Sequence, residues 1–308
     1  MNRALRIHAY GGSDVVHIDH IPVPDAGPGE VVVRVRAAGV NPVDWKIRDG
    51  LLRDAFPMAL PAVLGIELAG EVSAVGSGVT ALAVGDRVMG SLGGWGAYTD
   101  HVVIAANQLT LTPAGLDDVQ AAAIPVAALT AWQALFEAGE LKPGQTVLIH
   151  GAAGGVGSFA VQFARRIGAR VVCTAQGVNA GYLRALGADE VIDYRTSDFW
   201  KLTSQIDLVL DLVGGATLAH SWQVLAENGR IVSTAAPEIM ATTPQGKRGV
   251  WFQLQPDAEK LTEIANLVAR GDLTVEVSEV ADFTETAAVM ERNKTGHGPG
   301  KAVVTFRP

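Results

Sequence analysis

The sequence predicts an α/β protein of two domains, one rich in β-strands and one built on a doubly wound parallel sheet. A length of 308 residues exceeds that of most single compact domains. Short strand patterns separated by glycine turns fill residues 1–118, whereas apolar strands alternate with helices over 119–254. A glycine-rich turn at 151–157 follows a strand pattern and leads directly into a helical one.

Residues 1–118 are expected to form a small barrel-like β domain, interrupted by one helix at 42–48. Asn41 suits the N-cap of this helix, Pro42 its first position and Asp44 its first turn. Alternating apolar and polar residues at 30–37 are typical of a half-buried strand. Further strand patterns begin by Leu5 and occupy 63–75, 86–89 and 97–104.

Residues 119–254 are expected to form the parallel sheet, because its strand patterns are almost wholly apolar and alternate with helices. Helices are predicted at 121–138 and 182–186, and strands at 146–150, 170–175, 190–194, 207–213, 229–234 and 250–254. The tail contains an amphipathic helix around 261–268 and β patterns at 273–277 and 301–306. Its β character matches the first domain, so we assign 1–118 and 255–308 to one domain and treat 119–254 as an insertion.

The glycine turn carries the clearest functional signal in the sequence. Gly151, Gly154 and Gly157 recur every third residue between a strand and a helix, where small residues let a backbone approach a pyrophosphate. The start of the helix adds unpaired amides and the positive end of its dipole. This arrangement favours a dinucleotide-binding site over an ordinary glycine-rich turn.

Composition excludes several classes of function. Hydrophobic residues make up 48% of the chain, which is ample for two cores, and 24 basic against 32 acidic residues argue against nucleic acid as the main partner. The single cysteine, Cys173, rules out an internal disulfide and a cysteine-based metal cluster, and its apolar surroundings suggest a buried thiol. The sequence shows no signal peptide and no apolar run long enough to span a membrane, so we expect a cytoplasmic protein.

The glycine turn and six further motifs occur in order along the chain and together resemble the medium-chain dehydrogenase/reductase superfamily, in its zinc-independent quinone oxidoreductase and enone reductase branch. The resemblance implies a GroES-like catalytic domain and a Rossmann domain, with nicotinamide cofactor and substrate between them. It also implies a homodimer that pairs the sheet-edge strand at 250–254. The motifs occupy 38–44, 64–72, 85–88, 125–132, 186–194 and 300–304.

Departures from the zinc-dependent members of that superfamily indicate a metal-free reaction. The zinc enzymes have a ligand cysteine where this chain has Asn41 and a ligand histidine where it has Ile66, and neither residue serves zinc well. Without a metal, hydride transfer needs an acceptor that is already electron-poor, such as a quinone or an α,β-unsaturated carbonyl (an enone).

The resemblance points to Asn41 and Lys46 as catalytic residues near the nicotinamide and the substrate. Asn41 is equally suited to capping its helix, and Lys46 to a solvated surface position. Apolar residues of nearby loops are expected to wall the substrate pocket, with membership of the core as their alternative role. These residues are Leu51, Leu52, Phe56, Trp95 and Phe252.

The second strand of the parallel sheet favours NADPH as the cofactor. An acidic residue about 20 positions beyond the glycines would hold the ribose of NAD, and 170–179 contains none. Thr174 and Asn179 can donate to a 2′-phosphate, although Gly177 stands where some relatives have a lysine. The expected cofactor-binding residues are Thr130, Gly151, Gly154, Gly155, Val156, Gly157, Thr174, Asn179, Tyr194, Val213, Gly214 and Thr234.

The histidines suggest neither a metal site nor a nucleophile–base pair. His150 ends a buried strand pattern, where a hydrogen-bonded structural role is favoured over that of a base. The leading hypothesis is therefore an NADPH-dependent quinone or enone reductase. A zinc-free alcohol or aldehyde oxidoreductase and a non-catalytic NADPH-binding protein remain as alternatives.

Overall fold

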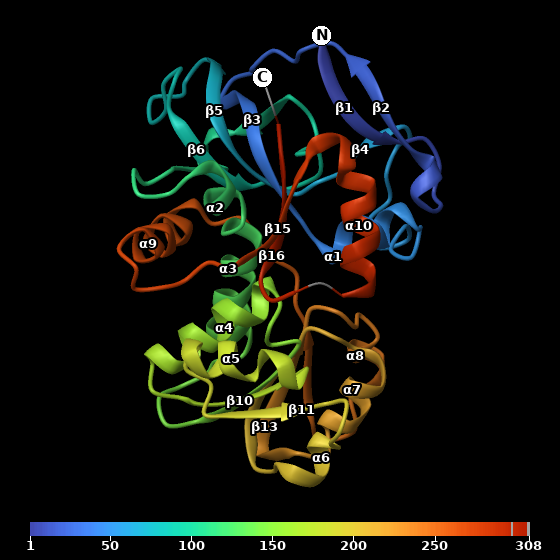
Figure 1. Cartoon of the computed structure of the whole chain (residues 1–308), viewed down its shortest axis with the longest axis vertical. Coiled ribbons are helices and arrows are strands. Elements are labelled where there is room, and N and C mark those ends of the chain that lie inside the picture. The colour runs from blue at the N-terminus through green and yellow to red at the C-terminus, as the bar shows by residue number, and fades with distance from the viewer. Residues whose placement is uncertain (297, 307–308) are drawn as a thin grey trace. The chain divides into compact units, whose positions relative to one another are not determined.

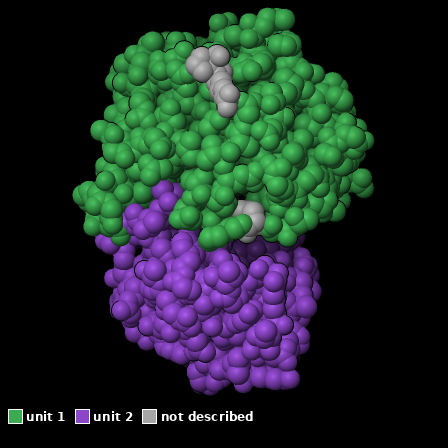
Figure 2. All heavy atoms as spheres, in the orientation of Figure 1, with its two compact units in different colours: residues 1–126, 255–272, 276–308 green, residues 127–254, 273–275 purple. Residues whose placement is uncertain are grey.

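The computed structural model describes residues 1–296 and 298–306 and divides into two compact units (Figures 1 and 2). Unit 1 comprises 1–126, 255–272 and 276–308, and unit 2 comprises 127–254 and 273–275. We expected the first boundary at 118/119, and it lies at 126/127. The Val126 N–H donates to the Glu67 carboxylate at a distance of 2.7 Å. This hydrogen bond connects the end of segment 119–126 to strand β5 (Glu67–Val75) of unit 1.

Unit 1 is built around a seven-stranded sheet in the order β15-β16-β3-β5-β6-β8, with β7 paired to β3. Its second sheet has the order β2-β1-β4. Valine, leucine and isoleucine side chains of β1, β3 and β5 fill the core with Tyr98 and Phe283. The strands are β1 (Asn2–Ile7), β2 (Val16–Ile21), β3 (Glu30–Val40), β4 (Ala62–Val63), β5 (Glu67–Val75), β6 (Arg87–Ser91), β7 (His101–Ala105), β8 (Leu109–Leu111), β15 (Val277–Asp282) and β16 (Lys301–Thr305).

The tail returns to the first β unit through β16, which pairs antiparallel with β3, and through β15, which pairs parallel with β16 (Figure 1). The predicted strand at 273–277 was wrong, because the strand begins at Val277. Instead, the Gln162 side chain accepts from the Thr274 N–H at 2.7 Å and donates to the Thr274 carbonyl at 2.9 Å. A side chain thus satisfies backbone groups that a sheet partner would otherwise have bonded.

Helix α1 spans Pro42–Arg48, as the sequence predicted. The Asp44 carboxylate accepts the Asn41 backbone N–H at 2.8 Å, while the Asn41 side chain makes no capping hydrogen bond. The other α-helices of unit 1 are α2 (Asp118–Ala122), α9 (Ala258–Ala269) and α10 (Thr286–Thr295).

Unit 2 contains a six-stranded sheet in the order β11-β10-β9-β12-β13-β14, and every neighbouring pair is parallel. This is the doubly wound arrangement that the sequence predicted, with β14 at one edge. The single helix expected at 121–138 is divided, because Pro125 begins a new helix and 133–138 is π-helical. The strands are β9 (Thr146–His150), β10 (Arg170–Ala175), β11 (Glu190–Asp193), β12 (Ile206–Asp211), β13 (Leu225–Ser233) and β14 (Arg248–Trp251).

The helices of unit 2 follow the strands in the alternation that parallel pairing requires. They are α3 (Pro125–Trp132, which begins in unit 1), α4 (Gly155–Arg166), α5 (Ala180–Leu186), α6 (Phe199–Leu202), α7 (Gly215–Ser221) and α8 (Ile239–Thr242). No helix in the described part of the chain is long and apolar enough to cross a membrane.

Candidate functional site

The carboxyl edge of the parallel sheet collects nearly all the predicted cofactor residues. Each of them follows the last residue of a strand or lies at its end, and parallel strands present those ends at one edge. Thr130 is the exception, since it lies within α3 and is buried. Thr174 is the second-last residue of β10, and the others follow their strands: 151–157 after β9, Asn179 after β10, Tyr194 after β11, Val213 and Gly214 after β12, and Thr234 after β13.

The backbone of the turn at 151–157 requires glycine at two positions. Gly151 has a φ of 69°, a left-handed conformation that favours glycine, and Gly154 precedes the first turn of α4. A Cβ at Gly157 would lie 2.5 Å from the Gly151 carbonyl oxygen and 2.6 Å from the Ala152 Cα. Any side chain at Gly157 would therefore push the helix away from the turn. The residues present fit the phosphates of a dinucleotide at the start of α4.

The centre of the carboxyl edge lies between β9 and β12, where the strand order reverses and ligands of such folds bind. His150 is fully buried there, and burial lowers its pKa to about 4, so the ring is neutral at neutral pH. Its Nδ1 lies 2.8 Å from the Thr174 hydroxyl and its Nε2 3.0 Å from the Ser221 hydroxyl. The structural role predicted for His150 is confirmed.

Asp211 organises the next turn of the edge. Its Oδ1 accepts the backbone N–H groups of Val213 at 3.1 Å and Gly214 at 2.9 Å. Its Oδ2 accepts the Ser233 hydroxyl at 2.7 Å, which places the end of β13 beside that of β12. Two predicted cofactor residues, Val213 and Gly214, are therefore held by a buried carboxylate that sequence reasoning did not single out.

Within unit 1, a buried network surrounds the predicted catalytic residue Asn41. The Asn41 Nδ2 donates to Glu67 Oε1 at 2.9 Å, and the Lys301 ammonium lies 2.6 Å from the same carboxylate oxygen. Lys301 also donates to Asn41 Oδ1, so the amide is oriented by a partner at each end. All three side chains are almost fully buried. Asn41 thus has a fixed orientation in the interior of unit 1.

A second buried pair includes Asp44, whose carboxylate accepts the Asn41 backbone N–H. The Tyr98 hydroxyl donates to Asp44 Oδ2 at 2.7 Å, and burial, more than any other effect, raises the pKa of Asp44 to about 6. Burial also raises the pKa of Tyr98 far above its ordinary value, so its hydroxyl remains a donor. Neither residue was among the predicted site residues, because nothing in the sequence places residue 98 beside residue 44.

Within unit 1, two of the expected pocket residues contact each other, and the other predicted residues differ in exposure. Lys46 lies half-buried on α1, with its Nζ 5.8 Å from the centroid of the Trp45 ring. Phe56 and Trp95 make an edge-to-face contact with centroids 6.2 Å apart, and Leu52 packs against the same core. Leu51 is 66% exposed. Phe252, in unit 2, is half-buried and follows β14.

Among the cavities of unit 1, two differ in the character of their lining. One, of about 380 Å³, has a largely apolar lining that includes Trp95, Met58 and Val63, with His101 at its wall. Trp95 is the one predicted pocket residue that lines it.

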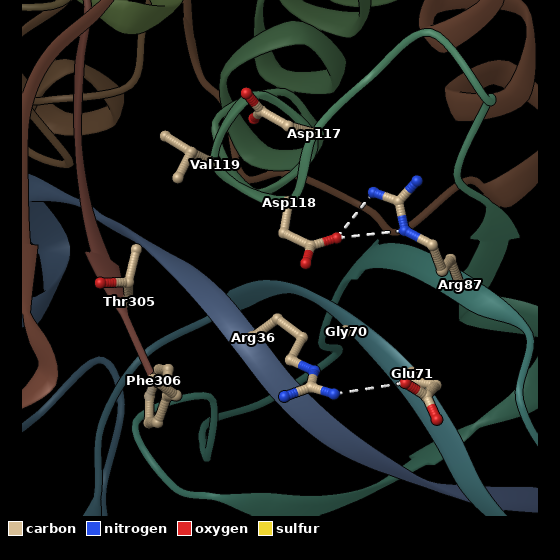
Figure 3. A pocket seen from close by; sticks show the side chains of 9 residues that line it. All are labelled: Arg36, Gly70, Glu71, Arg87, Asp117, Asp118, Val119, Thr305 and Phe306. Carbon is tan, nitrogen blue, oxygen red and sulfur yellow. Dashed lines mark hydrogen bonds and ion pairs between the residues drawn. The ribbon is translucent and has the colours of Figure 1, made fainter. Parts of the chain in front are cut away.

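The second cavity, of about 520 Å³, is lined mostly by charged side chains (Figure 3). Arg87 pairs with Asp118 at 2.7 Å, and Arg36 with Glu71 at 3.4 Å, so opposite charges face each other across it. No predicted site residue belongs to it.

The residues around Asn41 do not fit a zinc ion. The cationic Lys301 ammonium contacts both Asn41 and Glu67, so those oxygens already have a cation, and Asn41 and Ile66 are poor ligands. No group of three His, Cys, Asp or Glu side chains suited to a metal occurs in residues 1–296 and 298–306. His297 lies outside that range. Cys173 is buried, and burial raises its pKa to about 12.

Known proteins match nearly the whole length of this chain. A family model described as an alcohol dehydrogenase GroES-like domain matches residues 27–114, and one described as a zinc-binding dehydrogenase matches 186–304. The chloroplast envelope quinone oxidoreductase homolog of Arabidopsis thaliana is 34% identical, over 98% of this chain and 97% of its own length.

Two solved structures show the same fold. The quinone oxidoreductase of Coxiella burnetii superposes with a TM-score of 0.93 at 34% identity and covers 99% of both chains. The Escherichia coli quinone oxidoreductase, solved with NADPH, has a TM-score of 0.89 at 30% identity, over 99% of this chain and 100% of its own.

Proposed function

Because the chain belongs to the medium-chain dehydrogenase/reductase family, with quinone oxidoreductases among its relatives, we propose that it transfers hydride from NADPH to quinones or enones without a metal. The observation that carries the proposal is the Lys301 ammonium bound between Asn41 and Glu67. The Lys301 ammonium already binds the side-chain oxygens of Asn41 and Glu67, in the place where a metal ion would be needed. The hydride acceptor must therefore be electron-poor by itself.

The proposal assigns the cofactor to unit 2 and the acceptor to unit 1. The glycine turn at 151–157 would hold the pyrophosphate, and the bound nicotinamide supplies the hydride. Support for NADPH comes from the E. coli relative, which was solved with that cofactor. In unit 1, Asn41 is oriented by Glu67 and Lys301, and Lys46 on α1 would provide positive charge to the acceptor oxygen. We further propose a homodimer that pairs two copies of the edge strand β14.

A panel of acceptors tests this function directly. NADPH oxidation should be rapid with a quinone and with a 2-alkenal or an exocyclic enone, and negligible with saturated aldehydes. Turnover of saturated alcohols with the oxidised cofactor would instead support a zinc-free alcohol oxidoreductase. Binding of NADPH without oxidation by any acceptor would support a non-catalytic binding protein.

Chelation should leave the activity unchanged. After dialysis against a strong chelator, we expect kcat with a quinone to stay within about 20% of its starting value, since no step depends on a metal-bound oxygen. Elemental analysis of the active protein should find zinc well below one equivalent. Stoichiometric zinc, lost together with activity, would contradict the metal-free mechanism.

A further inference from the structure

A carboxylate reaches the expected ribose position from the neighbouring strand. A Cβ at Gly177, two residues beyond the end of β10, would lie 2.5 Å from Asp193 Oδ2. Asp193 is the last residue of β11 and lies opposite Ala175, the last residue of β10, in the parallel pairing. The acidic residue that holds a ribose diol usually stands at the end of the second strand of such folds, which is β10 here.

One oxygen of this carboxylate is available to a ligand. Asp193 Oδ1 accepts the Arg195 backbone N–H at 2.9 Å, which fixes the orientation of the side chain. Oδ2 accepts no hydrogen bond from the described residues and lies on the side of Gly177. Because Gly177 has no side chain, nothing from that position shields the carboxylate.

The hydroxyl of Thr174 is engaged by a side chain of the protein itself. Ser221 donates its only hydroxyl proton to the Thr217 carbonyl at 2.7 Å, so it must accept from His150 Nε2. In a neutral ring, His150 Nδ1 then has no proton and must accept from Thr174. Thr174, predicted as a 2′-phosphate donor, therefore donates inward to His150 in this structure.

We infer that Asp193 is a specificity-determining residue of the cofactor site, which accepts hydrogen bonds from the ribose hydroxyls of NADH and repels the 2′-phosphate of NADPH. This inference rests on the proposed function and refines it. It implies that NADPH and NADH are both used, and that the difference between their affinities is small. Removing the negative charge of Asp193 should increase the affinity for NADPH relative to that for NADH.

The test is a fluorescence titration of Asp193→Asn with NADPH and with NADH, in parallel with the wild-type chain. Asparagine keeps the acceptor for the Arg195 N–H and removes the charge. We expect the ratio of the NADH Kd to the NADPH Kd to rise about tenfold, the size of one screened charge–charge interaction. Adenosine 2′,5′-bisphosphate should also bind more tightly to the variant, which tests the adenosine end without the nicotinamide.

The matched control is Asp198→Asn. It removes a negative charge close in sequence to Asp193, from a carboxylate that pairs with Lys201. It should leave the ratio within twofold of wild type. Asp193→Ser should reproduce the result for Asp193→Asn, since it also lacks the charge. The assignment of Asp193 would be overturned if neither Asp193→Asn nor Asp193→Ser changed the ratio of the two Kd values. It would also be overturned if Asp198→Asn raised that ratio equally. Neither result would affect the proposed function. Failure of the wild-type chain to bind either dinucleotide would overturn the proposed function and the assignment with it.

Discussion

Replacing Lys301 by methionine should lower the free energy of unfolding by about 3–5 kcal/mol, because it leaves the Glu67 carboxylate buried without a counter-charge. The Glu67 side chain is fully buried and that of Lys301 is 7% exposed, so water cannot replace the lost ammonium. Thermal unfolding should begin about 10 °C lower, as expected for a loss of this size in a domain of 150–250 residues. Chemical denaturation followed by tryptophan fluorescence measures the change.

Two further variants separate loss of the ion pair from loss of packing. Lys294→Met removes a 40% exposed ammonium that pairs with Asp49, and it should cost less than about 1 kcal/mol. The double variant Glu67→Gln/Lys301→Met leaves no unpaired charge, and it should recover most of the stability that Lys301→Met loses. If the double variant is no more stable than Lys301→Met, the destabilisation comes from lost packing and not from an unpaired charge.

Lys46→Met should lower kcat for an enone by about 10²-fold if the Lys46 ammonium stabilises negative charge on the acceptor oxygen. Quinones should lose less, because their reduced form is aromatic and a stable anion that needs less help at oxygen. NADPH affinity should hardly change, since the glycine turn that would hold the phosphates belongs to unit 2. The measurement is the loss in kcat/KM for an enone and for a quinone in the same variant.

The chain offers a matched control for this experiment. The Nζ of Lys294 lies 5.5 Å from the Trp45 ring centroid, and that of Lys46 lies 5.8 Å from it. Lys294→Met therefore removes a second cation beside the same indole, and it should leave both substrates unaffected. Equal small losses for Lys46→Met would make this lysine a surface residue, and equal large losses would indicate damage to α1.

Local sequence patterns were sufficient to predict much of the fold of unit 2. The glycines at 151, 154 and 157, between an apolar strand and a helix, predicted the β9–α4 turn, and the alternation after it predicted a parallel sheet. These features depend on neighbouring residues and on the regular periods of strand and helix, which can be read along the chain. The same holds for α1, which begins at Pro42 and has Asp44 in its first turn, as predicted.

The pairing of distant side chains was not predictable in this way. The sequence marks Asn41 as a candidate, yet its partner Lys301 is 260 positions away and reaches it only because β16 pairs with β3. Likewise, a search along β10 finds no acidic residue, whereas the parallel register of β10 and β11 brings Asp193 to Gly177.

By itself, then, the sequence determined the two-unit α/β architecture, the glycine turn between β9 and α4 and the family, because short-range periodicity and ordered motifs encode them. Only the tertiary structure decided which charges meet. The Lys301–Glu67–Asn41 network, the inward hydrogen bond of Thr174 and the carboxylate beside Gly177 all depend on strand register and burial. No short turn joins β3 to β16 or β10 to β11, so their registers depend on how apolar faces of distant segments pack together.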